Sequence, residues 1–452
     1  MDANAAVIVL SAALAAAPGN AKMVQPTDPP SPAVVVGAQT LTIDAPELRH
    51  ETMKSKAPHP FASWMPSWDP WPGKTKTRQI ATLSLKKSRD EDNILVLGGF
   101  FRMVQPDSVK VTSADGTRTF KQGEDYKFND DWGQIANIGE RLGKWNEAEI
   151  KVEYDYATQR IDLIQVDAAG KASVKKGAAR MVCPMIPAPD AGAKPVAGVY
   201  VAPWKRNGKF VVTKDDIYPI KPAPPVAPIN PKAVAKTLAK LKDGKEAKIA
   251  FMGASITLGA EACAWWDEKI KFTEKDLAYR GRVIYQLRQK YPKATVTPIE
   301  AYRGGTTTKY GLEELNKTVV PTRPDLVLIA FGGNDVAGPI GKPPNNPAEQ
   351  FKKEMLRLVR GAKGAGMEVM LVVTMQQNPW LKNKVAERWP AYRAKLLEIG
   401  REENVAVADV YSEWMNLARR GIPPFSQLHN CINHPGPFGH GVYADVILRF
   451  FE

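Results

Sequence analysis

The sequence predicts two domains of different fold class, an all-β sandwich-like domain over residues 39–217 and an α/β domain with a five-stranded parallel sheet over residues 234–452. The chain has 452 residues, which is too long for one ordinary hydrophobic core. Alternating apolar and polar residues with turn signals fill the first half, whereas apolar strands separated by amphipathic helices fill the second. Between them, "YPIKPAPPVAPINPKA" is predicted to be a stiff, proline-rich linker at 218–233.

The first domain is predicted from strand pairs joined by tight turns. Asp115-Gly116 in "DSVKVTSADGTRTF" and Asn207-Gly208 in "GVYVAPWKRNGKFVVTKDD" each stand between alternating segments, which is a strong hairpin signal. "EIKVEYDYATQRIDLIQVD" adds two alternating runs, and "ILVLGGFFRMV" at 94–104 is either a buried strand pair or one broken strand. We therefore expect a β-sandwich.

The second domain is predicted from apolar runs that alternate with helical segments. Stretches such as "AEQFKKEMLRLVRGAKGAG" carry apolar residues at helical spacing. This alternation predicts a parallel sheet covered by helices on both faces, in three layers. Ligands of such sheets bind at the carboxyl ends of the strands. The expected strands are 248–252, 295–301, 326–331, 368–375 and 405–410.

Residues 1–38 are expected to form a signal-like or disordered N-terminal segment. The apolar stretch 5–17 has the length of a signal-peptide core and is too short to span a bilayer. Asp2 and the lack of a preceding Lys or Arg depart from the signal-peptide pattern. The segment favours a secreted or periplasmic protein, and we expect no integral membrane segment elsewhere.

The composition excludes several classes of protein. With 44% hydrophobic and 24% charged residues, the chain is typical of globular proteins. A net charge of +14 favours anionic partners, but the basic residues are spread along the chain without a nucleic-acid-binding motif, so we expect no nucleic-acid partner. The three cysteines, Cys183, Cys263 and Cys431, are too few for a disulfide framework and too scattered for a metal site. We expect no metal and no cofactor.

Four short segments place a polar residue or a glycine where such a sheet binds its ligand. Ser255 follows the first strand in "FMGASITLG", and Gly305 follows the second in "EAYRGGTTTKYG". Asn334 follows the third in "LVLIAFGGNDVAG", and His434 precedes the last helix in "HNCINHPGPFGHG". Taken singly, each has a structural explanation as a cap, a turn or an exposed loop residue.

Together the four segments resemble the GDSL-type, or SGNH, hydrolase superfamily, whose four blocks carry Ser, Gly, Asn and His in this order. The resemblance covers roughly residues 245–452 and implies a flavodoxin-like domain with the activity of a carboxylic ester hydrolase. It implies that Ser255 is the nucleophile and His434 its base. It also implies an oxyanion hole built from the N–H groups of Ser255 and Gly305 and the side chain of Asn334.

One position departs from the family pattern. Family members usually carry an Asp three or four residues before the histidine, and here Cys431 and Asn430 stand there. Asp409, at the end of the fifth strand, is a candidate acid, although a structural role explains it equally well. Alternatively, a backbone carbonyl orients His434, which leaves a Ser–His dyad. Because the acid mainly fixes the tautomer, its absence should lower the rate without abolishing activity.

Tryptophans suggest where a sugar substrate would bind. Trp64, Trp68 and Trp71 cluster in "PHPFASWMPSWDPWPG", and Trp265 and Trp266 follow the nucleophile. Exposed indoles stack on sugar rings, but these side chains are also explained by packing against the protein itself.

Three functions remain open on the sequence alone. The first is hydrolysis of a short acyl ester, such as an acetyl group on a carbohydrate. The second is transfer of an acyl group by the same residues. The third is a non-catalytic carbohydrate-binding or scaffold protein whose site has degenerated, as the missing acid allows.

Overall fold

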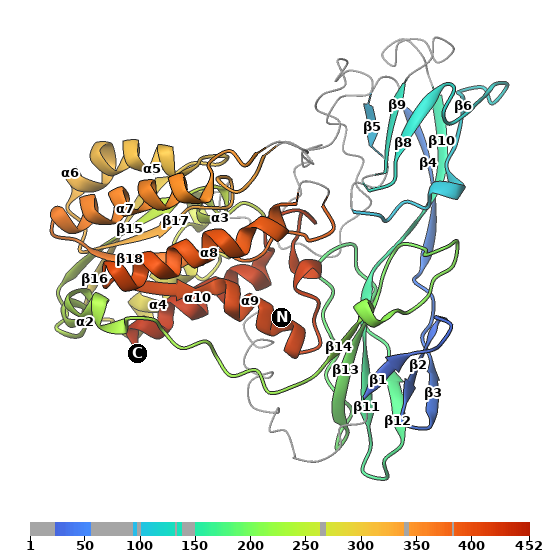
Figure 1. Cartoon of the computed structure of the whole chain (residues 1–452), viewed down its shortest axis with the longest axis horizontal. Coiled ribbons are helices and arrows are strands. Elements are labelled where there is room, and N and C mark those ends of the chain that lie inside the picture. The colour runs from blue at the N-terminus through green and yellow to red at the C-terminus, as the bar shows by residue number, and fades with distance from the viewer. Residues whose placement is uncertain are drawn as a thin grey trace. The chain divides into compact units, whose positions relative to one another are not determined.

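The computed structural model describes residues 23–55, 94–96, 101–131, 133–137, 150–262, 268–338, 343–381 and 384–452. The chain divides into two compact units (Figure 1). Unit 1 comprises the residues up to Ala223 together with Leu417–Ser426, and unit 2 comprises Pro224–Asn416 with Gln427–Glu452. The division at residue 223 falls inside the proline-rich segment 218–233.

Unit 1 is all-β, and its described strands pair antiparallel. One part of it consists of a three-stranded sheet, β1-β2-β3, and a four-stranded sheet, β12-β11-β13-β14. Val34 and Val36 of the first sheet share one apolar core with Ile164 and Val199 of the second. This is the sandwich arrangement that the alternating sequence predicts. The bounds are β1 Val24–Pro26, β2 Ala33–Val36, β3 Gln39–Thr42, β11 Arg160–Val166, β12 Ala172–Lys175, β13 Lys194–Val201 and β14 Ile217–Pro219.

Unit 1 contains two further sheets, β4-β10-β6-β7 and β5-β9-β8. The β6–β7 hairpin turns at Asp115-Gly116, as predicted. At the second predicted turn, Asn207 and Gly208 have positive φ angles between the bridged Arg206 and Lys209. The unit thus holds four sheets among its described residues, where a single sandwich has two. The bounds are β4 Leu48–Ser55, β5 Ile94–Val96, β6 Lys110–Ser113, β7 Thr119–Phe120, β8 Tyr126–Asn129, β9 Gln134–Asn137 and β10 Ile150–Ala157.

Unit 2 is built on a five-stranded parallel sheet in the order β16-β15-β17-β18-β19. Its strands match the five predicted runs to within two residues at either end. The order changes direction at β15, which lies between β16 and β17, so a ligand site is expected beyond the carboxyl end of this strand. The bounds are β15 Glu246–Gly253, β16 Thr295–Tyr302, β17 Leu326–Ala330, β18 Glu368–Val373 and β19 Ala406–Asp409.

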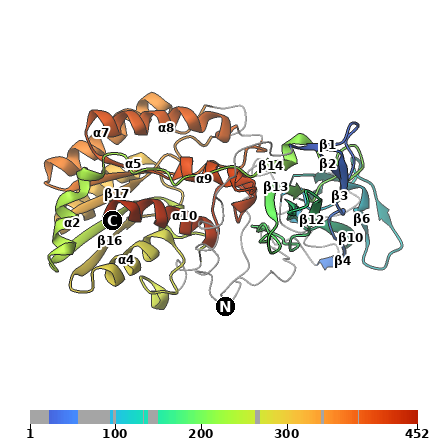
Figure 2. The same ribbon diagram turned by 90° about the horizontal axis from the view of Figure 1, so that it is seen from below.

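Helices cover both faces of this sheet (Figures 1 and 2). On one face, Phe351 of α7 and Trp389 of α8 pack into the core with Met252 and Ile329 of the sheet. On the other, Tyr279 of α4 lies against Phe251 of β15 and stacks on Tyr443 of α10 at 5.2 Å. The three-layer prediction is confirmed. The bounds are α2 Ala235–Lys242, α3 Ser255–Leu258, α4 Tyr279–Lys290, α5 Thr308–Glu314, α6 Val320–Thr322, α7 Ala348–Gly364, α8 Val385–Glu402, α9 Val410–Arg419 and α10 Pro437–Leu448.

The structure corrects the expected start of the all-β domain. Strands β1 and β2 lie inside 1–38, which the sequence assigns to a signal-like or disordered segment. Val34 and Val36 are fully buried, so this part of the segment belongs to the sandwich core. The signal-like stretch itself lies outside the described residues. Among the residues that are described, no helix is long and apolar enough to cross a membrane.

Candidate active site

A tight turn holds Ser255 at the carboxyl end of β15. The strand ends at Gly253, and Ser255 is the first residue of α3. Position 253 has no room for a side chain, since a Cβ there would lie 2.1 Å from Thr257 Oγ1. The N–H groups in the first turn of a helix have no acceptor within the helix. The Ser255 N–H is therefore suited to bind an oxygen close to its own hydroxyl.

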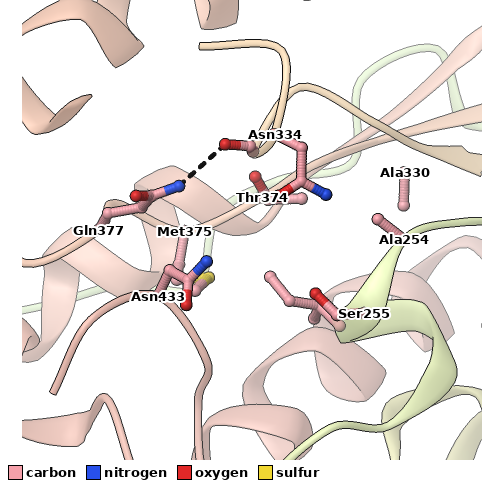
Figure 3. Close-up of a pocket in the computed structure, with 10 residues that line it drawn as sticks. Ala254, Ser255, Ala330, Asn334, Thr374, Met375, Gln377 and Asn433 are labelled. Atoms are coloured by element: carbon pink, nitrogen blue, oxygen red, sulfur yellow. Dashed lines mark hydrogen bonds between the residues drawn. The ribbon is translucent and has the colours of Figure 1, made fainter. Parts of the chain in front are cut away.

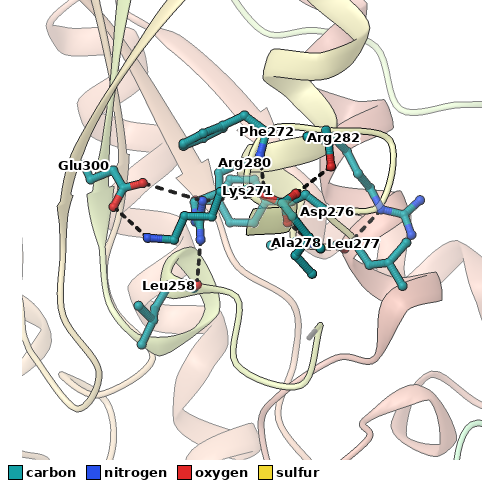
Figure 4. Close-up of polar contacts among 12 residues, drawn as sticks. Leu258, Lys271, Phe272, Asp276, Leu277, Ala278, Arg280, Arg282 and Glu300 are labelled. Atoms are coloured by element: carbon teal, nitrogen blue, oxygen red, sulfur yellow. Dashed lines mark hydrogen bonds and ion pairs between the residues drawn. The ribbon is translucent and has the colours of Figure 1, made fainter. Parts of the chain in front are cut away.

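A buried arginine braces the end of α3 (Figure 4). Arg280 is fully buried and donates a hydrogen bond from Nη2 to the Leu258 carbonyl at 3.2 Å. Its guanidinium lies 5.2 Å from the ring centre of Phe272 and 4.9 Å from that of Tyr302. Asp276 Oδ2 lies 3.7 Å from Nη1. Burial raises the pKa of Asp276, and the adjacent guanidinium opposes that rise. These contacts fix the short helix that carries the serine.

His434 contacts the hydroxyl of Ser255. Its Nε2 lies 2.6 Å from Ser255 Oγ, and its side chain is 17% exposed. It stands in residues 428–436, the histidine loop, which folds back on itself: the His429 N–H donates to the His434 carbonyl at 2.7 Å. The structure thus brings together two side chains that the sequence singled out. An imidazole in contact with a serine hydroxyl is the arrangement in which the base takes the proton as the oxygen attacks.

Asn430 organises the histidine loop and fixes one edge of the imidazole. Its Oδ1 accepts hydrogen bonds from the backbone N–H groups of Ile432, Asn433 and His434 at 2.9, 2.8 and 2.9 Å. Its Nδ2 lies 2.8 Å from His434 Nδ1. Asn430 and Cys431 occupy the two positions at which the resemblance implies an aspartate. An amide therefore meets the ring nitrogen that a carboxylate would hold.

Asn334 and Ser255 line one small cavity, which Figure 3 shows between the end of β17 and α3. The cavity encloses about 380 Å³, including space that is open to solvent. Asn334 Nδ2 donates to the Thr306 carbonyl at 2.8 Å. Because an amide nitrogen carries two hydrogens, the second remains for a ligand oxygen. Gln377 lines the same cavity and donates from Nε2 to the Gly333 carbonyl at 3.0 Å.

Of the glycine pair after β16, Gly304 is the one that packs against Ser255. A Cβ built on Gly304 would lie 3.9 Å from Ser255 Cβ, whereas a Cβ on Gly305 would meet nothing within 4 Å. Gly305 has a φ of +76°, in the left-handed region that favours glycine. The assignment of the Gly305 N–H to an oxyanion hole stays a prediction, and Gly304 is a neighbour that the motif did not single out.

Asp409 does not have the surroundings expected of the acid. Arg393 Nη2 lies 2.5 Å from its Oδ2, and Ser412 Oγ donates to the same oxygen at 2.7 Å. The residue is 4% exposed at the end of β19, an edge strand of the sheet. Its charge is neutralised within this cluster. The structure therefore gives Asp409 a structural role in place of the catalytic one considered for it.

The carboxylate beside the imidazole is that of Glu261. Its Oε1 lies 4.0 Å from His434 Nδ1, and its Oε2 lies 2.9 Å from His429 Nδ1. Its side chain is 6% exposed. No sequence signal points to this residue, because the contact joins two loops that are distant along the chain and carry no shared motif.

The tryptophans predicted to bind substrate, Trp64, Trp68, Trp71, Trp265 and Trp266, lie outside the described residues. Their role stays a prediction. Within the described part of the chain, no group of three or more His, Cys, Asp or Glu residues is arranged to hold a metal ion.

Comparison with known proteins gives one family match. Residues 251–442 match the GDSL-like Lipase/Acylhydrolase family, and the match includes Ser255, Asn334 and His434. No curated protein matches the chain.

Similar solved structures include a two-domain esterase (CEX) active on acetylated mannans, with 24% identity, a TM-score of 0.37, and coverage of 48% of this chain and 53% of that chain. They also include Axe2, an acetylxylan esterase from Geobacillus stearothermophilus, with 20% identity, a TM-score of 0.39, and coverage of 46% and 96%. A third is LAE5, an α/β hydrolase from the metagenome of Lake Arreo, with 19% identity, a TM-score of 0.38, and coverage of 45% and 94%.

This chain spans about half the length of the two-domain esterase. At these TM-scores the structural likeness is partial. The family match covers the part of the chain that holds the serine, the histidine and the cavity. Residues 251–442 are a domain of the GDSL-like lipase/acylhydrolase family.

Proposed function

We propose that this domain hydrolyses short acyl esters by a Ser–His mechanism, with Ser255 as the nucleophile and His434 as the general base. The observation that carries the proposal is the 2.6 Å contact between Ser255 Oγ and His434 Nε2. Ser255 and Asn334 also line the same cavity. The family match supports a carboxylic ester hydrolase as the enzyme class.

The reaction follows from these positions. Ser255 Oγ attacks the ester carbonyl while His434 Nε2 takes its proton, and the carbonyl oxygen becomes negatively charged. The Ser255 N–H and Asn334 Nδ2 are the proposed donors to that oxygen, with the Gly305 N–H as a predicted third. The imidazolium then gives its proton to the leaving alcohol. Water repeats the sequence on the acyl-enzyme and releases the acid.

The cavity supports a small acyl group. Its apolar lining includes Ala254, Ala330 and Met375, and its polar lining includes Ser255 and Asn334. Acetyl is the substituent we propose. We also propose that a carbohydrate carries the ester, and the support for this is the group of tryptophans in the sequence. The apolar stretch 5–17 supports an extracytoplasmic location.

Hydrolysis of p-nitrophenyl acetate tests the proposal. We expect turnover by the wild type and a loss on the order of 10⁴-fold to 10⁶-fold in kcat for both Ser255→Ala and His434→Ala, because the two groups act as a unit. Ser426→Ala is the matched control, since Ser426 is a buried serine whose hydroxyl donates to the Pro423 carbonyl. Equal rates for the wild type and the two site variants would end the hydrolase proposal.

The same assay separates hydrolysis from acyl transfer. With a sugar alcohol added as acceptor, a hydrolase releases acetate in proportion to the nitrophenol formed. An acyltransferase yields an acetylated sugar instead, and its nitrophenol release rises with the acceptor concentration. A non-catalytic protein shows no turnover that depends on Ser255.

A further inference from the structure

One ring nitrogen of His434, Nδ1, faces the side-chain amide of Asn430. For Nε2 of His434 to accept the serine proton, the neutral ring must carry its hydrogen on Nδ1 and donate it to an acceptor. Asn430 Nδ2 faces Nδ1, and an amide nitrogen is a donor. Turning the amide to present Oδ1 would break its three hydrogen bonds to backbone N–H groups. The Asn430 side chain therefore does not supply the acceptor that the mechanism needs.

Glu261 supplies a negative charge at this position. Its Oε1 lies 4.0 Å from His434 Nδ1, and both side chains are largely buried, at 6% and 17% exposure. An opposite charge within about 4–6 Å favours the charged form of a titratable group, and burial weakens solvent screening. The carboxylate is thus placed to stabilise the imidazolium that forms during the reaction.

The backbone around Glu261 has an uncommon conformation. The residue has a φ of +72°, in the left-handed region that bulky side chains rarely adopt. Residues held there cluster at sites where the surroundings demand a particular side-chain position. The turn that leads to it is anchored to the nucleophile, because the Ala260 N–H donates to the Ser255 carbonyl at 3.0 Å. This turn therefore places Glu261 next to His429 and His434.

We infer that Glu261 is the positioning residue for His434 and takes the place of the missing loop aspartate. Its carboxylate lies on the Nδ1 side of the imidazole, 4.0 Å away, so its charge favours the ring form with the hydrogen on Nδ1 and stabilises the imidazolium. The transferred proton moves only from Ser255 Oγ to Nε2 and then to the leaving alcohol, while Glu261 stays ionised. The inference rests on the proposed function.

Other titratable groups lie near the imidazole. His429, in the same loop, contacts Glu261 Oε2 at 2.9 Å. His440 of α10 also interacts electrostatically with His434, but burial lowers the pKa of His440 to about 3, so it is neutral at pH 7. Of these neighbours, Glu261 is the one that brings a negative charge.

The first test needs no activity. Long-range ¹H–¹⁵N spectra of the full chain labelled at histidine report which ring nitrogen carries the proton, and His434→Ala assigns the signal. In Glu261→Gln we expect the share of His434 with its hydrogen on Nδ1 to fall relative to the wild type. An unchanged tautomer distribution in a folded variant would overturn the inference.

The second test uses the pH dependence of kcat/KM, with the active enzyme counted by organophosphonate titration. In Glu261→Gln we expect kcat to fall about 10-fold to 100-fold with little change in KM, because the imidazolium loses its counter-charge. The acid limb of the profile should move down by about one pH unit, since loss of an opposite charge disfavours protonation. Introducing Asn430→Asp into Glu261→Gln should restore the rate.

Asp409→Asn is the matched control, because it removes a buried carboxylate that the structure places with Arg393 and Ser412. We expect its acid limb to coincide with that of the wild type. If Glu261→Gln has the same pH profile as the wild type and its turnover still depends on Ser255, the inference about Glu261 is overturned and the proposed function is not. Turnover independent of Ser255 would overturn the proposed function instead.

Discussion

The loop after β17 and the histidine loop both contribute to the cavity, but their buried carboxylates come from different places. In the first, Asp335 follows Asn334 directly and accepts hydrogen bonds from the Thr308 and Gly332 N–H groups, both at 3.1 Å. It also accepts from Asn346 Nδ2 at 3.0 Å and is fully buried. In the histidine loop, the residue that binds the backbone is an amide. The nearby carboxylate is brought in from the loop after α3.

This difference separates two uses of a buried charge. The Asp335 oxygens are surrounded by backbone and amide donors, so the carboxylate stabilises a loop and has no reacting group to influence. Burial nevertheless raises its pKa, and the hydrogen bonds oppose that rise. The oxygens of Glu261 face imidazole nitrogens of His429 and His434 instead. We therefore expect substitutions near Asp335 to change stability and substitutions around His434 to change rate.

The largest expected effect comes from giving the histidine loop its own carboxylate. In Asn430→Asp, one oxygen keeps the backbone hydrogen bonds and the other accepts the His434 Nδ1 hydrogen. We expect kcat/KM for p-nitrophenyl acetate to rise on the order of 10³-fold. This is somewhat below the roughly 10⁴-fold that the reverse exchange costs a Ser-His-Asp triad, since Glu261 already supplies part of the charge. A folded variant with an unchanged rate would contradict the tautomer argument.

The second largest effect is expected from removing the side-chain amide of Asn334, which lines the cavity together with Ser255. Asn334→Ala is expected to lower kcat by about 10²-fold to 10³-fold with little change in KM, because an oxyanion donor acts in the transition state. Steady-state kinetics beside Asn316→Ala, an exposed helical asparagine, measure the effect. A loss confined to KM would show that Asn334 binds substrate without stabilising the oxyanion.

Replacing the carboxylate of Asp335, in the loop after β17, tests whether this buried charge stabilises the fold. Asp335→Asn places amide hydrogens against N–H donors of Thr308 and Gly332. We expect the free energy of unfolding to fall by about 1–3 kcal/mol, the cost of leaving buried donors without an acceptor. Urea unfolding followed by fluorescence measures it. A stable variant that instead loses its rate would assign Asp335 to the reaction.

The smallest effect concerns His440 and the pH dependence of stability. Its Nδ1 accepts the Tyr279 N–H at 3.2 Å, and burial lowers its pKa to about 3. The unfolded chain binds a proton near pH 6.5 and the folded chain does not. The stabilisation by neutral His440 is therefore complete above about pH 6.5 and is lost as the pH falls towards 3.

The expected loss is up to about 1.4 kcal/mol per pH unit, and urea unfolding at several pH values measures it. His440→Gln should reduce the slope. The same slope in the wild type and in His440→Gln would assign the acid sensitivity to other groups.

The parallel sheet was predictable because its strands alternate with helical patterns along the chain, and β15, β17, β18 and β19 contain apolar runs. The positions of Ser255 and Asn334 could be predicted for the same reason, since both residues lie in the segments that follow such strands. The strands β1 and β2 were missed because their short apolar runs follow a signal-like stretch. Glu261 was not predictable, because its position depends on a left-handed turn and on the packing of a loop remote in sequence.

Asp409 shows the converse error. Its place at the end of a strand is correct, but β19 lies at the edge of the sheet, and Arg393 and Ser412 bind the carboxylate there. Strand ends identify the edge of the sheet where chemistry occurs. They do not specify which neighbouring side chains bind a polar residue at that edge.

Covalent labelling tests the pairing of Ser255 with His434 most directly. The full chain is treated with an organophosphonate, and the modified residue is located by peptide mass spectrometry. One label per chain on Ser255, lost when the imidazole is removed in His434→Ala, is the predicted result. Labelling that is absent, falls on another serine or persists undiminished in the His434 variant would show that this hydroxyl is not activated by that imidazole.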